Sequence, residues 1–420
     1  MITILLFVII FFLIAAIILY LAYSKSNRRN HKAQTNHEFS GLSLISEYPG
    51  KYSFIETSDS GYAENSRNLG NCHKLSPSQD IKRRARLLPY NTKREIPRAA
   101  FSLTDQIGGG NFGDVSKGEL KGLYGENSKT TVAIKSINGP AEGVELRDFL
   151  EEIKIMSYIK PHINLVSMIG SCYSDTQYER EMYLLIEFCP YGDLRTYLIE
   201  NKIQILSGKP ESTMHNRCLL YWSYEIAKGM EYLAKNNIMH GDLATRNVLL
   251  DESLIHGSHP VAKITDFGLS KKIYDDTNYL KEARLYVPWK WMAPEYLRND
   301  YFTLTSDVWS FGIVLWEILS FSRVPYGHDE YDEVLLKLED GYRLPCPGDI
   351  KNILNWSAIN YYDDVTKECF VENPKKRANF SKVVEIIESY LSEKELSFFK
   401  QLELKYESER SAKYMKIGLK

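Results

Sequence analysis

Several short motifs follow one another in a set order along this chain, and that order restricts the fold more than any other feature. The first motif is IGGGNFGDV, which places Gly108, Gly110 and Gly113 in GxGxxG spacing. Glycine lets a turn between strands approach an anion closely, with backbone N–H groups facing it. A glycine-rich hairpin turn without a ligand gives the same pattern. The segment VAIK follows, however, and its Lys135 would add a positive charge for phosphate groups.

A lysine with this role needs a carboxylate to hold it in place. The segment RDFLEEIKIM has apolar residues at helical spacing and offers Glu151 and Glu152. Glu152 stands at the position that matches the motif, and Glu151 is the alternative. We expect the glutamate that does not pair with Lys135 to be an ordinary solvated helix charge.

Three later motifs add groups for phosphate chemistry. In HGDLATRN, Asp242 would accept the proton of a substrate hydroxyl, and Asn247 would bind a Mg²⁺ ion. Asp266 opens the DFG motif directly after the apolar approach VAKIT, and it would hold the other metal ion. An APE motif follows at 293–295. The five motifs, in this order, predict a protein kinase fold.

The coarse pattern of strands and helices predicts an α+β, two-lobed architecture. We expect a small N-lobe over about 99–189, with an antiparallel sheet and one main helix. A larger helical C-lobe would cover about 190–391. The polar segment 24–98 reads as a mostly disordered linker, and the charged tail 392–420 as an amphipathic or fraying helix.

From Leu88 to about Leu391 the chain resembles the catalytic region of receptor tyrosine kinases of the platelet-derived, vascular endothelial and fibroblast growth factor receptor group. The segments that carry the resemblance are LPYNTKREIPR, DDTNYLKEARLYVPWKWMAPE, SDVWSFGIVLWEI and ENPKKRANF. It implies a transferase that uses ATP and Mg²⁺. It also implies that Tyr279 is the regulatory phosphosite, that Asp307 braces the catalytic loop, and that Glu295 and Arg377 form a buried ion pair.

Two positions favour tyrosine over serine or threonine as the phosphate acceptor. Serine/threonine kinases generally have lysine two residues after the catalytic aspartate, whereas this chain has Ala244. Arg246 stands where tyrosine kinases place a charge-stabilising arginine, and Pro288 resembles the platform for a substrate tyrosine ring. The resemblance also implies an adenine site, with apolar walls, a gatekeeper and backbone hydrogen-bonding groups. The apolar walls would be Val115, Ala133 and Leu249. Ile186 would be the gatekeeper, and Glu187 and Cys189 would supply the backbone groups.

One residue departs from the family pattern. Gly241 replaces the arginine that pairs with the phosphate on the activation-loop tyrosine, here Tyr279. Lys271 is another candidate partner for that phosphate. Every position implied to contact ATP or metal is intact, so we predict an active kinase with weakened activation-loop regulation. The alternatives are a catalytically weak pseudokinase scaffold, recruiting partners through tyrosines such as Tyr406 and Tyr414, and a truncated gene model.

The first residues predict a membrane anchor. The run 1–23 is almost wholly apolar, and about 22 residues at 1.5 Å each reach roughly 33 Å. Four basic residues follow between Lys25 and Lys32, which favours an outside N-terminus and a cytoplasmic kinase domain. A cleaved signal peptide is the rival interpretation, but no positive charge leads the run and no small-x-small site ends it. We expect a single-pass protein, in the plasma membrane, that lacks an ectodomain.

The expected partners follow from these assignments. They are ATP, protein substrates with tyrosine, the membrane, phosphotyrosine-binding adaptor proteins and a second copy in a homodimer. A formal net charge of −2 gives no support to a nucleic-acid partner. The six cysteines form no CxxC pair, so they indicate neither a zinc site nor a disulfide framework.

Overall fold

The computed structural model describes ten stretches of the chain, all within one compact unit, Asp59–Lys420. They are residues 88–110, 113–125, 127–137, 143–175, 180–207, 217–255, 258–266, 288–299, 301–348 and 358–417. The predicted anchor 1–23, most of the linker and Tyr279 lie outside them. Within these stretches, no helix is both long and apolar enough to cross a membrane.

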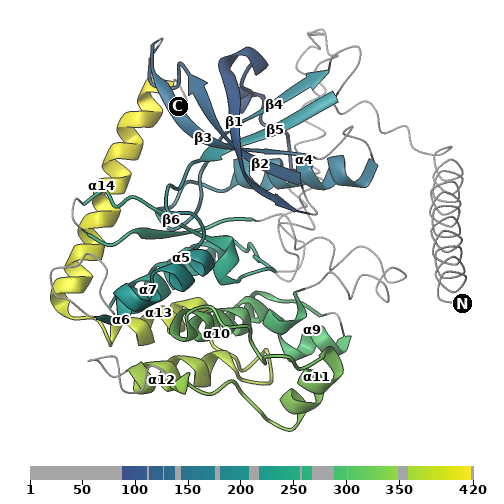
Figure 1. Cartoon of the computed structure of the whole chain (residues 1–420), viewed down its shortest axis with the longest axis vertical. Helices are drawn as coiled ribbons and strands as arrows, with labels where there is room; N and C mark the ends of the chain where they lie inside the picture. Colours follow the sequence, from purple (N-terminus) through teal and green to yellow (C-terminus); the bar gives the residue numbers. More distant parts are fainter. Residues whose placement is uncertain are drawn as a thin grey trace, which may run out of the picture. The chain divides into compact units, whose positions relative to one another are not determined.

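The first half of the domain is an antiparallel sheet of five strands in the order β1-β2-β3-β5-β4 (Figure 1). The strands are β1 (Phe101–Gly110), β2 (Gly113–Lys121), β3 (Lys129–Ser136), β4 (Met168–Asp175) and β5 (Arg180–Glu187). Between β3 and β4 the chain forms helix α4 (Gly143–Tyr158). This arrangement confirms the predicted N-lobe of an antiparallel sheet with one main helix.

Aromatic and β-branched side chains on one face of the sheet form its core. Phe101, Val132, Ile134, Tyr183 and Leu185 are each at most 5% exposed and belong to one cluster. Such residues pack well on a pleated surface, which explains why these segments form strands. On β3, Val132 to Ile134 are all buried, so this strand is the centre of the lobe.

Residues 88–98, which we assigned to the linker, lie against the sheet. The hydroxyl of Tyr90 is 2.9 Å from that of Ser171 on β4, and the N–H of Ile96 donates to the Ser171 carbonyl at 2.8 Å. The Arg94 guanidinium donates to the Met168 carbonyl at 3.1 Å. Two short 3-10 helices, η4 (Thr92–Arg94) and η5 (Arg98–Ala100), lead into β1.

The second half is helical, as predicted. Its helices are α5 (Leu194–Glu200), α6 (Lys202–Ser207), α7 (Cys218–Lys235), α9 (Pro294–Asn299), α10 (Leu304–Ser320), α11 (Tyr331–Glu339), α12 (Ala358–Cys369) and α13 (Phe380–Glu388). Helix α10, with the sequence LTSDVWSFGIVLWEILS, is mostly apolar and is buried nearly all round. Behind it the Arg377 guanidinium forms a fork with the Glu295 carboxylate at 2.7 and 2.9 Å, and the Arg377 side chain is 0% exposed.

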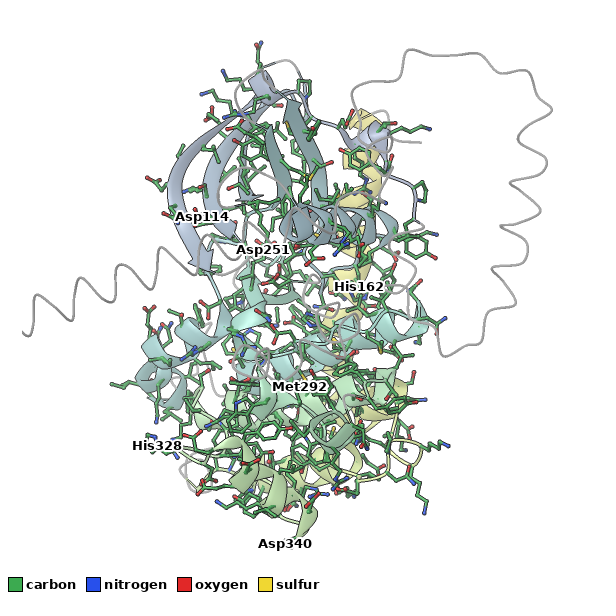
Figure 2. The ribbon with its side chains drawn as sticks, turned by 90° about the vertical axis from the view of Figure 1, so that its right-hand side faces the viewer. Asp114, His162, Asp251, Met292, His328 and Asp340 are labelled. Atoms are coloured by element: carbon green, nitrogen blue, oxygen red, sulfur yellow. The ribbon has the colours of Figure 1, made fainter. Side chains whose placement is uncertain are left out.

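A short hairpin lies between the two halves. Strands β6 (Val248–Asp251) and β7 (Val261–Ile264) pair with each other, and the N–H of Val166, just before β4, donates to the Ile264 carbonyl at 2.8 Å. Figure 2 places Asp251, at the end of β6, between the sheet above and the helices below. The hairpin is flanked by the catalytic loop before it and the DFG aspartate after it.

The charged tail forms a helix, α14 (Glu393–Ile417), that packs back along the domain (Figure 1). Its Phe399 and Leu402 are 5% and 2% exposed. The Phe399 ring centroid lies 5.5 Å from that of Tyr221 and 4.8 Å from that of Tyr224, both on α7. The packing of this helix against the C-lobe was not anticipated from its sequence.

Candidate active site

Lys135 and two carboxylates meet at the junction of the two halves. The Lys135 ammonium on β3 lies 2.8 Å from Glu152 on α4 and 3.1 Å from Asp266, two residues past β7. Burial by itself would lower the lysine pKa, but the two carboxylates reverse this and raise it. Of the two candidate partners, Glu152 is thus the one that contacts Lys135. Glu151 is 4% exposed, so our expectation of a solvated helix charge was wrong for it.

Asp266 has an uncommon backbone conformation. Its φ of +67° lies in the left-handed region, which side chains other than glycine, asparagine and aspartate rarely adopt. Burial would raise the pKa of its carboxyl, but the Lys135 ammonium outweighs burial and lowers it. Backbone conformations of this kind cluster at functional sites, where the surrounding structure holds them. Asp266 therefore carries an ionised carboxylate in a fixed direction.

Asp242 lies at the centre of a second group. The Arg246 guanidinium donates to one of its oxygens, and the Asn247 amide donates to the other at 2.8 Å. Arg246 and Asn247 belong to the 3-10 helix η6 (Thr245–Asn247), which turns their side chains back toward Asp242. Burial raises the pKa of Asp242 to about 6, although both neighbours oppose this. A carboxylate with such a pKa is suited to accept a proton near neutral pH.

The loop that carries Asp242 is held from behind by Asp307, which is 1% exposed on α10. Its two carboxylate oxygens accept the N–H groups of His240 at 2.7 Å and Gly241 at 2.9 Å. The His240 ring links this loop to the DFG approach, because its Nε2 lies 2.9 Å from the Thr265 carbonyl. A carbonyl only accepts, so Nε2 carries the proton, and Nδ1 accepts the Asp242 N–H at 3.2 Å.

Gly241 adopts φ = +81°. Glycine reaches this region without the steric cost that a Cβ brings. Its N–H is held by Asp307, so the conformation is part of the braced loop. The position thus combines two properties, the absence of a charged side chain and a left-handed backbone.

The glycine-rich turn lies between β1 and β2, with Gly108 and Gly110 on β1 and Gly113 opening β2. Gly113 has φ = +129°, and a Cβ there would lie 2.0 Å from the Ser136 carbonyl oxygen. No other residue could take this position without moving β3. A Cβ at Gly108 would meet only ordinary van der Waals contacts, the nearest at 3.7 Å from Val115.

The predicted adenine walls lie on neighbouring strands. Val115 is paired with Lys135 across β2 and β3, and Ala133 is paired with Ile186 across β3 and β5. Leu249 on β6 forms a bridge with Asp193, just after the segment that joins the lobes. Ala133 and Leu249 are thus each paired with a residue next to this segment.

We call residues 187–192, which join β5 to the C-lobe, the hinge. The Glu187 carboxylate already has two partners, since it accepts from the Lys263 ammonium at 3.0 Å and from the Ser167 N–H at 2.7 Å. The Glu187 N–H donates to the Ser167 carbonyl at 3.1 Å, which leaves the Glu187 carbonyl as the group it could offer to a nucleotide. Cys189 is 6% exposed.

Sequence reasoning missed the residues that hold Arg246. The Arg246 guanidinium lies 4.6 Å from the centre of the Trp291 ring, and the Trp291 indole donates to Glu317 at 2.9 Å. The Glu317 carboxylate also accepts the Thr245 N–H at 3.0 Å. The signal was present in the WKW segment after Pro288, because a tryptophan face attracts an arginine cation. Tyr279 and Lys271 lie outside the described residues.

The residues around Asp266 suit Mg²⁺ and ATP phosphates. Mg²⁺ prefers oxygen ligands and usually keeps several waters, so one or two protein ligands are enough. Asp266 supplies a carboxylate. Asn247 uses its amide nitrogen on Asp242, which leaves its amide oxygen as the atom for a cation.

Residues 101–387 match the family model described as protein tyrosine and serine/threonine kinase. Vascular endothelial growth factor receptor 3 of Coturnix coturnix is 32% identical over 361 residues, covering 73% of this chain and 25% of the receptor. Mast/stem cell growth factor receptor Kit of Gallus gallus is 30% identical, with 73% and 37% covered. Platelet-derived growth factor receptor alpha of Homo sapiens is 29% identical, with 72% and 34% covered.

These matches agree with the two-lobed fold and with the grouping of Lys135, Glu152, Asp242 and Asp266. The chain spans between a quarter and 37% of the length of these relatives. The matches fall on the kinase region, and the relatives are all receptor tyrosine kinases. The chain belongs to the protein tyrosine and serine/threonine kinase family, with a domain of the receptor tyrosine kinase type.

Proposed function

We propose that this chain is an ATP-dependent protein tyrosine kinase. The observation that carries the proposal is the joint placement of two groups, Lys135 with Glu152 and Asp266, and Asp242 with Arg246 and Asn247. A phosphoryl transfer site needs a cation for the phosphates, metal ligands and a base for the acceptor hydroxyl. All three kinds of group are present, and their ionisation is tuned by specific neighbours.

In the proposed reaction, ATP is a substrate that lies between the glycine-rich turn and the hinge. Lys135 holds its phosphates, and Glu152 fixes the lysine through their 2.8 Å contact. Asp242 accepts the proton of a substrate tyrosine hydroxyl as that oxygen attacks the γ-phosphorus and ADP departs. Arg246 lies beside Asp242 and can stabilise charge that develops on the transferred group. Bound Mg²⁺, held by Asn247 and Asp266, would neutralise phosphate charge.

We further propose that Gly241 weakens the link between activity and phosphorylation of Tyr279. Glycine has no side chain to contact Asp242, and the contacts of that aspartate are made by Arg246 and Asn247. An arginine there would offer a charge-assisted bond to a phosphate, and glycine cannot. Regulation rather than chemistry is therefore the expected loss.

Membrane attachment through residues 1–23 completes the proposal. The apolar run and the basic residues after it support a single-pass anchor with a cytoplasmic kinase domain, and the matched relatives are named as receptors. Deleting residues 1–23 should move the chain from the membrane fraction to the soluble fraction of expressing cells. A chain that stays with the membrane after the deletion would contradict the anchor.

The central experiment measures ATP-dependent tyrosine phosphorylation of a generic tyrosine peptide by the purified chain. Asp242→Asn is the matched control, because it removes the base and keeps nearly the same shape. We expect activity in the parent and a loss of at least ~100-fold in the variant, in line with the usual contribution of a general base. A folded parent that binds Mg-ATP without turnover would instead support a membrane-tethered phosphotyrosine scaffold.

A further inference from the structure

Helix α14 is held to the domain very differently along its two halves. In the first half, the Arg217 guanidinium forms a fork with the Glu395 carboxylate, and two of the contacts are 2.8 and 2.7 Å. Phe399 and Leu402 are buried there. This half combines a charged fork with apolar burial, so it is firmly anchored to the C-lobe.

The second half begins at Glu403, and its described side chains lack an anchor of this kind. Among its described side chains, residues 403–409, none is buried, and Leu404 is 58% exposed. The Lys405 ammonium donates to the Leu254 carbonyl from an exposed position. Tyr406 is half-buried, and it is the aromatic side chain of this stretch that reaches inward. Among the described side chains of this half, Tyr406 is the one that places an aromatic ring against the domain.

Tyr406 lies over the charged groups behind the hinge. The Lys263 ammonium is 5.3 Å from the centre of its ring, and its hydroxyl is 3.4 Å from that of Ser167. Lys263 is 3% exposed and lies 3.0 Å from the Glu187 carboxylate and 3.7 Å from that of Asp251. A neutral aromatic ring is suited to cover such a lysine, since its face attracts the cation.

A phosphate on Tyr406 would be incompatible with this arrangement. One ammonium and two carboxylates give the group a formal charge of −1, and phosphotyrosine would add roughly −1.5 to −2. Its three oxygens would have to enter where the hydroxyl now meets Ser167, beside the Glu187 carboxylate that already accepts the Ser167 N–H at 2.7 Å. Lys263 cannot compensate, because both carboxylates already share it.

We propose that Tyr406 is a phosphorylation site, and that its phosphorylation releases the second half of α14 from behind the hinge. The phosphate comes from ATP through a tyrosine kinase active site. The Tyr406 oxygen forms a bond to the γ-phosphorus, the bond between that phosphorus and ADP breaks, and the phenolic proton passes to the active-site aspartate. This inference rests on the proposed function where the chain phosphorylates its own Tyr406. It does not rest on that function where another tyrosine kinase supplies the phosphate.

The test measures hydrogen exchange of the full chain in detergent, by mass spectrometry, before and after phosphorylation. One arm uses the parent with ATP and Mg²⁺. A second arm uses the Asp242→Asn chain, phosphorylated by an added tyrosine kinase. In both arms we expect phosphate on Tyr406 and a fall of at least ~10-fold in protection of residues 403–417, equivalent to about 1.4 kcal/mol. Protection of residues 393–402 should stay unchanged.

Two control variants make the result specific. Tyr406→Phe keeps the ring over Lys263 and cannot be phosphorylated, so it should show no loss of protection after the same treatment. Leu404→Ala alters an exposed neighbour on the same helix and should behave as the parent does.

The proposal would be overturned by phosphate on Tyr406 without a change in protection, or by failure of both arms to phosphorylate Tyr406. An equal loss of protection in Tyr406→Phe would also overturn it. If only the second arm gives phosphate and release, the proposed kinase activity fails and the inference about Tyr406 stands.

Discussion

Replacing Gly241 by alanine tests the backbone conformation of the catalytic loop. The residue has φ = +81°, and its N–H donates to Asp307 at 2.9 Å, so the loop cannot relax without losing that bond. A Cβ in the left-handed region costs roughly 1–2 kcal/mol. We therefore expect Gly241→Ala to lower the free energy of unfolding by about that amount. Urea denaturation of the purified chain, followed by tryptophan fluorescence, measures it.

Gly241→Arg introduces the same backbone strain as Gly241→Ala and also a positive charge. Comparing the two variants therefore separates the effect of strain from the effect of charge. Both should lose similar stability. Only the arginine variant should gain dependence on Tyr279, because a hydrogen bond between charged groups contributes about 1.5–3 kcal/mol. That range corresponds to a stimulation of roughly 10- to 100-fold on phosphorylation of Tyr279, measured as kcat/KM on a tyrosine peptide with Tyr279→Phe as control.

Two results would refute this reasoning. An alanine variant as stable as the parent would mean that the left-handed conformation of Gly241 carries no strain for other residues. An arginine variant whose activity ignores Tyr279 would mean that the missing arginine does not explain regulation in this chain.

Three further predictions concern the site and its support. Because burial raises the pKa of Asp242 to about 6, the carboxylate is protonated below that pH and cannot accept a proton. A profile of kcat/KM against pH should therefore fall on the acid side of about 6, and a profile flat down to pH 5 would argue against Asp242 as the base. Glu152→Gln removes the charge that holds Lys135 and should raise the KM for ATP while the thermal unfolding temperature changes little. A KM equal to that of the parent would show that the pair is dispensable. Arg377→Leu leaves the Glu295 carboxylate buried without its partner, so the free energy of unfolding should fall by about 3–5 kcal/mol. A loss below about 1 kcal/mol in denaturation would show that the pair adds little.

The motifs specified which residues meet in the site, although not how they meet. Lys135 and Glu152 are 17 positions apart. The register of helix α4 decides whether Glu151 or Glu152 faces the lysine. Lys135 and Asp266 are 131 positions apart, and their 3.1 Å contact depends on how the β6–β7 hairpin docks beneath the sheet. No local pattern reports that docking, because it results from packing of the whole lobe.

The backbone of Gly241 and the support of Arg246 could not be predicted from the sequence, because each depends on residues distant along the chain. The left-handed φ of Gly241 is imposed by Asp307 on α10, a residue 66 positions away. The support of Arg246 by Trp291 and Glu317 likewise comes from elements that meet only in the folded domain.

Short-range rules let the sequence alone determine the order of the motifs, the strand-rich and helical halves, and the residue types of the site. Glycine sterics, helical periodicity and β-branched packing each act over a few residues, so they can be read locally. The tertiary structure alone decided that α14 packs on the domain and that Tyr406 covers Lys263. The apolar residues of that helix are too few to give a clear amphipathic pattern. Their burial depends on a surface made by α7, the β6–β7 hairpin and Ile163, which exists only after the rest of the chain has folded.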